Sequence, residues 1–277
     1  MKKVFININS ESLGDNIAWL PYVEEYRVKH DCRVVTNFRY PHLFRDSYPY
    51  IGFFSDVPYG YDVIDVTMTD KTLPLQQSAC DCLNLPFREI RPRFNTSKLK
   101  KLGRRIVTIS EYGSNYSRMW NNPYGWRMVV DYLRTRSYTV MAVSHESTQL
   151  QNVIDYTGHG LIDVCNALYS SDMFVGVNTG LSWLAWSLSV PVVMIGSNTK
   201  PYFEFQEGNY RISADSTNPS ICTGCYNNNQ LDVPWEDVWC PYYKDTVRQH
   251  ECTKTISPKT VIKGIDKVIE NIALKYK

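Results

Sequence analysis

Hydrophobic residues along this chain fall into short continuous runs and into longer stretches with helical spacing. Residues 4–8 form the first short run, which is typical of a buried strand, and residues 15–29 carry apolar side chains at helical spacing. Pro21 falls in the early turns of that expected helix, where a missing amide hydrogen is tolerated. Further strands are expected at residues 33–36, 61–66, 105–110, 138–143, 173–177 and 191–195, and further helices at residues 125–136, 161–170, 179–188 and 257–274. Because strands and helices alternate along the chain, the sequence predicts an α/β fold with largely parallel sheets.

The stretch from residue 83 to residue 102 separates two alternating halves. It contains Pro86 and Pro92, which disfavour regular structure, and it is rich in basic residues. We therefore expect two α/β domains, residues 1–102 and residues 103–277, with this stretch as the linker at the end of the first. Folds of this kind bind ligands beyond the carboxyl ends of their strands, so the loops after the strands are the places to look for chemistry.

The composition suits an enzyme-sized folded chain. With 277 residues and 43% hydrophobic content it can bury a substantial core, and no apolar run is long enough to span a membrane. The first ten residues alternate like a strand and lack the cleavage site of a signal peptide, which favours a cytoplasmic protein. The net charge of +2 neither favours nor excludes a nucleic-acid partner.

Positive charge is concentrated in residues 88–105, which we call the basic strip. Its eight basic residues stand against one acid, Glu89. They are Arg88, Arg91, Arg93, Lys98, Lys100, Lys101, Arg104 and Arg105. A solvated linker would have this composition, and so would a surface that contacts phosphates.

Four of the eight cysteines are grouped in the last quarter of the chain, within residues 221–253, which we call the finger. They are Cys222, Cys225, Cys240 and Cys252. A CxxC pair on a tight turn directs two thiolates to one point, and two later thiolates can complete a tetrahedron. The residues between them are too polar to order themselves by apolar burial, so we expect a structural metal, zinc or iron, and no organic cofactor. The remaining cysteines are expected to be buried as small apolar residues.

Two loops follow expected strands. The first carries a candidate for acid–base catalysis, and the second carries residues suited to binding an anion. In residues 12–17, Gly14 allows a close turn and Asp15 lies at a helix N-terminus, where an ordinary capping role is the alternative. In residues 177–183, the small residues Asn178, Thr179 and Gly180 precede a helix and leave amides free for a phosphate. Capped turns of this composition also occur without a ligand.

Two further cations lie near the same predicted edge. Lys200 follows the next strand along the chain. Arg118 stands in the aromatic and polar loop of residues 110–126, where it could neutralise a diphosphate. The alternative for Arg118 is an ion pair inside a loop held together by its aromatic rings.

These segments carry a resemblance to a known family. Residues 12–21 (SLGDNIAWLP) resemble the GD…LP signature of heptosyltransferases, and residues 176–185 (GVNTGLSWLA) resemble their DTGLSHLA motif. The finger, with CTGC, WCP and ECT, and residues 120–126 (WNNPYGW) are similar to the autotransporter (protein O-) heptosyltransferase family, related to the lipopolysaccharide heptosyltransferases of glycosyltransferase family 9. The resemblance covers most of the chain in order.

The resemblance implies a GT-B fold, in which two Rossmann-like domains face each other across a cleft. It implies an inverting glycosyltransferase that moves heptose from ADP-heptose to a protein serine, with iron in the four-cysteine finger. Asp15 would then be the catalytic base, and Arg118 would take the place of a diphosphate-binding lysine. The remaining donor-site residues by position would be Gly14, Asn178, Thr179, Gly180, Leu181 and Lys200.

Some positions differ from the family pattern. Asn178 and Trp183 replace the Asp and His of the lipopolysaccharide enzymes' motif. The family also carries a region before its first Rossmann strand, whereas the first expected strand here starts at Val4, so we expect the acceptor and the oligomeric state to need separate tests. A homo-oligomer and a nucleotide-sugar donor are expected partners, and a membrane is not.

Two alternatives remain at this point. One keeps the enzyme class but transfers the sugar to a hydroxylated base in DNA, which would use the basic strip. The other is a nonenzymatic cysteine-finger module that binds nucleic acid or protein, since four-cysteine fingers often do so.

Overall fold

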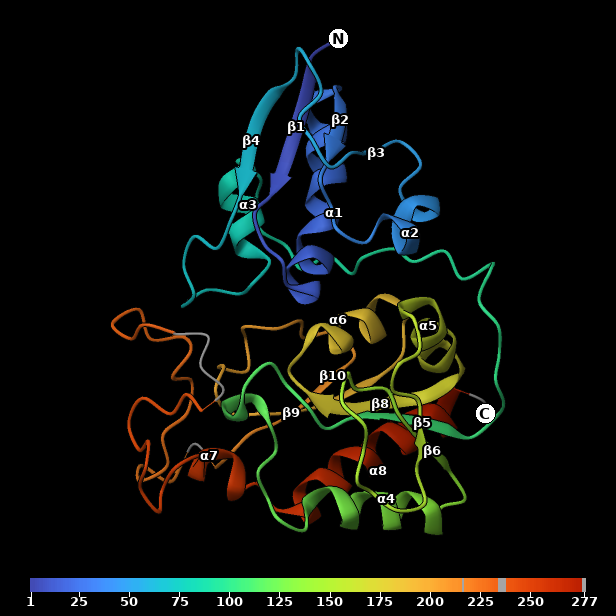
Figure 1. The fold of residues 1–277 in the computed structure, drawn as a ribbon, viewed down its shortest axis with the longest axis vertical. Coiled ribbons are helices and arrows are strands. Elements are labelled where there is room, and N and C mark those ends of the chain that lie inside the picture. The colour runs from blue at the N-terminus through green and yellow to red at the C-terminus, as the bar shows by residue number, and fades with distance from the viewer. Residues whose placement is uncertain (216, 234–237, 276–277) are drawn as a thin grey trace.

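The computed structural model describes residues 1–215, 217–233 and 238–275. Two parallel sheets lie one above the other along the long axis of the molecule (Figure 1). The first sheet has the order β3-β2-β1-β4. Its strands are β1 (Lys3–Ile8), β2 (Arg33–Thr36), β3 (Gly52–Phe53) and β4 (Asp62–Val66), joined by the helices α1 (Leu13–His30), α2 (Pro41–Phe44) and α3 (Gln77–Leu83).

The second sheet has six parallel strands in the order β10-β9-β8-β5-β6-β7. These are β5 (Ile106–Ser110), β6 (Thr139–Ala142), β7 (Ile154–Asp155), β8 (Ser171–Val177), β9 (Val192–Ile195) and β10 (Asn209–Ile212). Helices α5 (Leu161–Ser170) and α6 (Gly180–Ser187) lie on the face toward the first sheet, and α4 (Gly125–Thr135) and α8 (Pro258–Lys275) cover the other face (Figure 1). The expected α/β fold with parallel sheets is confirmed.

Two apolar cores hold these layers together. One runs from the first sheet and α1 through α5 and α6 to the near face of the second sheet, and includes Trp19, Trp183 and Trp186. The other fills the space between the second sheet and helices α4 and α8. Helices α1 and α6 pack directly against each other, and this contact makes the first core continuous across the two sheets.

Several short elements were not expected from the sequence. The two-residue strands β3 and β7 and the half-buried strand β10 have no clear period, and α3 ends at Leu83, where the stretch taken as linker begins. α1 begins two residues earlier than expected and continues through Pro21, which therefore lies in the helix interior rather than in its first turns. Tertiary packing outweighs the missing amide hydrogen there, since Ala18, Trp19, Leu20 and Tyr22 around it are all fully buried.

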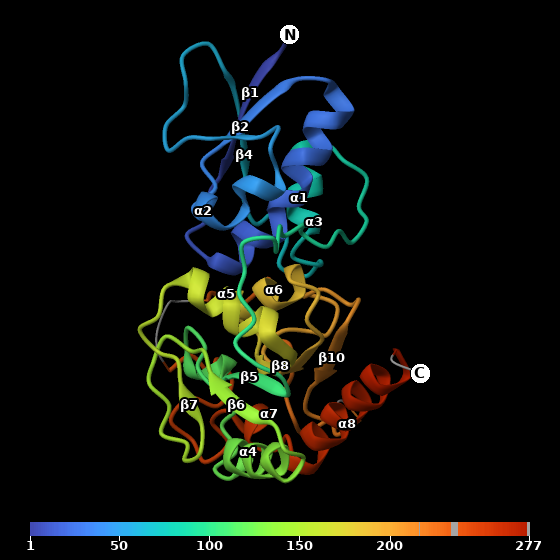
Figure 2. The same ribbon diagram turned by 90° about the vertical axis from the view of Figure 1, so that its right-hand side faces the viewer.

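The segment between α3 and β5 runs as an extended chain from the first sheet to the second, alongside α5 (Figures 1 and 2). Much of the basic strip contacts the protein itself. Arg88 pairs with Glu25 at 2.8 Å, Arg91 with Glu207 at 3.2 Å and Arg93 with Glu24 at 3.6 Å, and Lys98 pairs with Asp46. These ion pairs fasten the segment to both halves of the chain.

The finger, residues 221–253, is built mainly of turns beside the second sheet. Residues 234–237, which include the polar stretch Trp235-Glu236-Asp237, lie outside the described part of the chain. α7 (Glu251–Lys254) begins just before Cys252. Among the described residues, no helix is both long enough and apolar enough to cross a membrane.

Candidate active site

Asp15 is held in the first turn of α1 by hydroxyl groups. Ser10 follows β1 and donates a hydrogen bond from Oγ to Asp15 Oδ2 at 2.7 Å, while the N-cap Ser12 accepts from the Asp15 amide at 3.4 Å. Burial raises the pKa of the Asp15 carboxyl, and the two serine hydroxyls together with the positive charge of Arg118 oppose that rise. A carboxylate with a raised pKa in a cleft is suited to accept a proton near neutral pH.

The N-terminal ends of α1 and α6 meet at two glycines. A Cβ added to Gly180 would lie 2.7 Å from Leu13 Cβ and 2.9 Å from the Gly14 amide nitrogen. A Cβ added to Gly14 would lie 3.5 Å from Gly180 Cα and 3.3 Å from Trp183 Cδ1. The two backbones can approach this closely only because position 180 has no side chain, whereas a methyl group at Gly14 would be tight but closer to ordinary contact. This contact brings Asp15, one residue after Gly14, next to the start of α6.

A cavity of about 820 Å³, which we call the central cavity, lies between these two helix ends. Its wall includes Ser10, Asp15 and Met68 from the first half of the chain and Arg118, Thr179 and Tyr226 from the second. The hydroxyl of Thr179 is buried in the capping box that begins α6, where Ser182 is the other member. The sequence prediction that Asp15 and the turn before α6 face the same space therefore agrees with the geometry.

Arg118 reaches the central cavity from the short 3₁₀ helix Tyr116–Arg118 after β5. Its guanidinium lies over the ring of Tyr226, 5.7 Å from the ring centre. Its Nε is buried and without a hydrogen-bond partner among the described residues. Arg118 and Thr179 thus line one cavity, where the guanidinium charge and the free amides at the start of α6 suit a bound anion.

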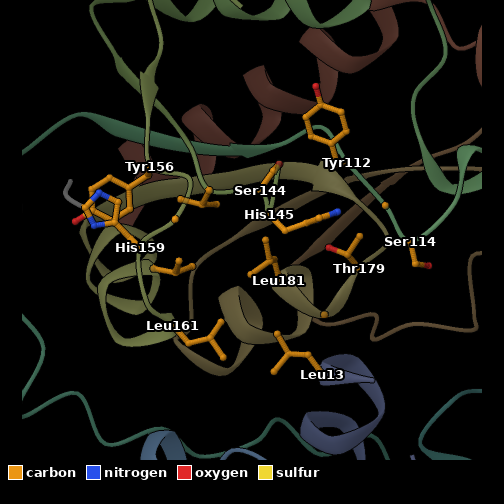
Figure 3. A pocket seen from close by; sticks show the side chains of 15 residues that line it. Leu13, Tyr112, Ser114, Ser144, His145, Tyr156, His159, Leu161, Thr179 and Leu181 are labelled. Carbon is orange, nitrogen blue, oxygen red and sulfur yellow. The ribbon is translucent and has the colours of Figure 1, made fainter. Parts of the chain in front are cut away.

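A second cavity, of about 550 Å³, opens from the central cavity at the start of α6, and we call it the histidine cavity (Figure 3). The two share Leu13, Ser114, Thr179 and Gly180. Stacked rings of Tyr156 and His159, 3.9 Å apart, stand at the far end, and His145 points inward between the ends (Figure 3). The remaining wall is largely apolar and includes Val143, Leu161, Val164 and Leu181. An apolar pocket with a few polar groups, joined to an anion site, has the form of a nucleotide-binding site.

Asn178 lies behind this surface, in a buried polar network. Its Nδ2 lies 3.0 Å from Asn198 Oδ1, 3.1 Å from Thr199 Oγ1 and 3.2 Å from Glu204 Oε1. Glu204 in turn forms a buried ion pair with Arg211 at 2.7 Å. Asn178 is absent from the walls of the central and histidine cavities, so its effect on them runs through the backbone of Thr179.

Two other predicted donor-site residues also contact protein instead of these cavities. Lys200 Nζ donates to Thr223 Oγ1 at 3.2 Å, and the lysine side chain packs against Gly224 in the CxxC turn. Gly14 contacts α6 and is not part of either wall. Gly180 and Leu181 do line the histidine cavity, beside Thr179.

The four finger cysteines influence one another electrostatically. The side chains of Cys222 and Cys252 are hydrogen-bonded, and this bond, burial and charge on Cys222, Cys225 and Cys240 all raise the pKa of Cys252. The pKa of Cys222 is lowered to about 7, chiefly by its hydrogen bond to Cys252. Four thiolates are a donor set for iron or zinc. Among the described residues, however, no three His, Cys, Asp or Glu side chains are already arranged as a metal-binding group.

Sequence reasoning missed several residues that line the two cavities, notably His145, Tyr156, His159 and Tyr226. His145 follows β6, so the rule that ligands bind at carboxyl ends of strands could have found it. Tyr226 could not be found that way, because the finger reaches the cavity only through its tertiary position.

No profile of a known protein family matches the chain. Individual relatives do match. It is 31% identical over 288 residues to the autotransporter heptosyltransferase Aah of Escherichia coli, which covers 94% of this chain and 72% of Aah. It is 28% identical over 295 residues to the autotransporter heptosyltransferase TibC of Escherichia coli O78:H11, covering 96% of this chain and 71% of TibC.

Solved structures give the same picture. The crystal structure of TibC, described as an iron-containing dodecameric glycosyltransferase, aligns with a TM-score of 0.90 over 98% of this chain and 77% of that chain, at 27% identity. TibC has also been solved in complex with ADP-D-β-D-heptose. The E. coli ADP-heptose lipopolysaccharide heptosyltransferase II aligns with a TM-score of 0.64 over 99% of this chain and all of that chain, and at 11% identity it supports the fold alone.

Proposed function

Because the chain belongs to the autotransporter heptosyltransferase family, and is thus a glycosyltransferase, we propose that it transfers heptose from ADP-heptose to a serine hydroxyl of a protein. The observation that carries this proposal is the direct contact of α1 with α6, which brings the Asp15 carboxylate and the Thr179–Gly180 turn to one cavity. Inverting transfer needs a base that takes the acceptor proton and, facing it, a site that binds the leaving diphosphate. In a GT-B arrangement the first half of the chain would supply the base and the second half the diphosphate site.

Asp15 is the proposed catalytic base. As it accepts the proton of the serine hydroxyl, a bond forms between that oxygen and the anomeric carbon, and the bond from this carbon to the β-phosphate oxygen breaks. Attack from the face opposite the leaving ADP inverts the configuration and requires no covalent sugar intermediate. The raised pKa of the carboxyl favours proton uptake, while Ser10 fixes its orientation.

The leaving diphosphate is proposed to lie between Arg118 and the N-terminus of α6. The free amides there can donate to phosphate oxygens, and the helix dipole favours negative charge. Arg118 supplies a full positive charge, and its Nε is available for a hydrogen bond. Lys200, engaged with the CxxC turn, acts on this site only through the loop that it holds.

The nucleoside of the donor is proposed to fill the histidine cavity. Its apolar wall and the stacked Tyr156 and His159 suit a nucleobase, and the shared Thr179 and Gly180 join it to the diphosphate position. Heptose then extends into the central cavity toward Asp15. The complex of TibC with ADP-heptose supports this donor.

Iron on Cys222, Cys225, Cys240 and Cys252 is proposed as a structural crosslink of the finger. The description of TibC as iron-containing supports the metal, and the spacing of the four cysteines, two of them in a CxxC turn, supports the ligand set. When bound, the metal supplies structural order, since four thiolates leave no coordination position for substrate. The finger carries Tyr226 into the central cavity, so its order bears directly on the site.

The alternative of transfer to DNA is less well supported, because four of the eight basic residues in the strip already pair with carboxylates of the chain itself. The continuous core makes the second alternative, a cysteine-finger module, a poor description of the chain. A homo-oligomer is proposed by analogy with the dodecameric TibC.

Asp15→Asn tests the proposed function most simply. The amide keeps an oxygen for the Ser10 hydroxyl but cannot accept a proton at neutral pH, so transfer from ADP-heptose should fall by about 10²–10⁴-fold. The affinity for ADP, measured by calorimetry, should change little. Asp131→Asn, at an exposed position of α4, is the matched control. Near-normal turnover of the Asp15 variant would reject the assignment.

A further inference from the structure

The finger contacts the first half of the chain as well as the second. The contact lies on the loop between β4 and α3, residues 67–75, which we call the crossing loop and which descends from the first sheet toward the finger (Figure 1). Hydrogen bonds join the crossing loop to the finger, from Asn227 Nδ2 to the Lys71 carbonyl, from Lys71 Nζ to the Leu231 carbonyl, and from Asn229 Nδ2 to Asp70 Oδ1 at 3.0 Å.

Asn227 is the buried residue in this contact. Its side chain is only 8% exposed, and its Oδ1 accepts a hydrogen bond from the Lys200 amide at 2.6 Å. Its own amide donates to the Gly224 carbonyl at 3.0 Å. One residue therefore joins the crossing loop, the loop after β9 and the CxxC turn. Since both the oxygen and the nitrogen of the carboxamide are used, neither a carboxylate nor an apolar side chain of the same size can replace it.

The residues beside these hydrogen bonds form two walls of the central cavity. Tyr226 directly precedes Asn227 in the finger, and Thr67 and Met68 begin the crossing loop; all three line the cavity. The ring of Tyr226 also lies against the Arg118 guanidinium. The bond from Asn227 to the crossing loop therefore influences how closely the wall from the first half approaches the wall that carries Tyr226.

We propose that Asn227 is a positioning residue for sugar transfer, which holds the Tyr226 wall and the Met68 wall of the central cavity at a fixed separation. The inference rests on the proposed transferase function and adds a residue that acts through others, because Asn227 itself is not part of the walls of the central and histidine cavities. A misplacement near 1 Å between reacting groups costs about 10²-fold in rate, so a smaller shift of one wall still slows the reaction measurably.

A positioning role differs measurably from a purely structural one. A residue that only supports folding lowers Tm, and the protein that remains folded keeps its kcat. A positioning residue lowers kcat in folded protein. The affinity for ADP should then be nearly unchanged, because the histidine cavity, where the nucleoside is proposed to bind, takes no wall residue from the finger or from the crossing loop.

Two variants weaken the contact from its two sides. Asn227→Asp keeps the oxygen for the Lys200 amide and removes the donor to the Lys71 carbonyl. Lys71→Met removes the bond to the finger from the first half and keeps an apolar stem. The double variant removes both bonds and prevents the introduced carboxylate from pairing with the Lys71 ammonium. Asn228→Asp is the matched control, because it loses an amide donor to the Tyr242 hydroxyl within the finger.

Three quantities are measured on each protein: kcat for ADP release from ADP-heptose, the Kd of ADP by calorimetry, and hydrogen–deuterium exchange of residues 67–75. Each single variant should lower kcat by about three- to tenfold, and the double variant by about tenfold or more, while the Kd of ADP stays within about twofold. Amides of the crossing loop should exchange about three- to tenfold faster in the variants, as expected for the loss of one hydrogen bond. The control should match the wild type in all three.

The outcomes are distinguishable. Wild-type kcat in the double variant would overturn the positioning role, even if Tm falls, and so would equal losses of kcat and ADP affinity, which would indicate damage to the whole site. Unchanged exchange of residues 67–75 would show that these bonds do not hold the crossing loop, and would overturn the proposal as well. If the wild type neither binds ADP nor releases it from ADP-heptose, the proposed function itself fails.

Discussion

Replacing Gly180 with alanine tests the contact that assembles the site. The added methyl carbon would lie 2.7 Å from Leu13 Cβ and 2.9 Å from the Gly14 nitrogen. Since carbon atoms pack best at about 3.5 Å or more, α1 and α6 must separate by roughly 0.8 Å. The Gly14 contact is less tight, with 3.3 Å to Trp183 and 3.5 Å to Gly180, so Gly14→Ala needs a shift of only about 0.2 Å.

The expected magnitudes follow from these distances. Overpacking of this kind costs about 1–3 kcal/mol, partly offset by the better helix propensity of alanine, so Gly180→Ala should lower Tm by several degrees. A displacement near 1 Å between Asp15 and the α6 N-terminus should reduce kcat by about 10²-fold. Gly14→Ala should show smaller losses in both. Gly160→Ala has open space for its methyl, so it should leave kcat unchanged and lower Tm only slightly through the α5 N-cap.

The assay is thermal unfolding together with initial rates of ADP release from ADP-heptose. The losses in Tm and in rate should increase in the order Gly160→Ala, Gly14→Ala, Gly180→Ala. Tolerance of alanine at Gly180, or a larger loss at Gly14 than at Gly180, would refute the argument that these backbones set the distance across the central cavity.

Four further outcomes are expected. Arg118→Gln should move the acidic limb of the kcat/KM profile to higher pH, because the Arg118 charge lowers the pKa of the Asp15 carboxyl; an unmoved limb would contradict this. Thr179→Val should weaken ADP binding by about three- to tenfold and lower Tm slightly, since the hydroxyl belongs to the capping box that begins α6; calorimetry and thermal unfolding check both. Asn178→Asp should destabilise the protein by setting a second carboxylate against Glu204, and adding Glu204→Gln should restore part of Tm; a double variant no better than the single one would reject the network argument. If the finger holds the proposed metal, a chelator that removes it should lower Tm, and an unchanged Tm would exclude a structural role.

Much of the fold was predictable because the strands of the parallel sheets are nearly continuous apolar runs. Strand β2 and helix α5 match the expected ranges, and the other long elements differ by one or two residues. The short strands β3, β7 and β10 were not predictable, since two to four half-polar residues have no measurable period. Pro21 was misjudged because burial of its neighbours decides the helix, not the local amide.

Residues of the candidate site were predictable from the sequence only where they directly follow a predicted strand. Asp15, Arg118 and Thr179 follow strands, and the structure brings them to one cavity. Asn178 follows a strand as well, but its amide faces the buried Glu204, which no local pattern could indicate. The place of Tyr226 depends on how the finger folds back to the cleft, so its role is a tertiary property.

The most direct test of the whole account is a crystal structure of the protein with ADP. We expect the diphosphate on the amides that begin α6 and on Arg118, with adenine in the histidine cavity and the β-phosphate directed toward the cavity that holds Asp15. ADP bound at any other surface, or in an orientation that places adenine beside Asp15, would contradict the account.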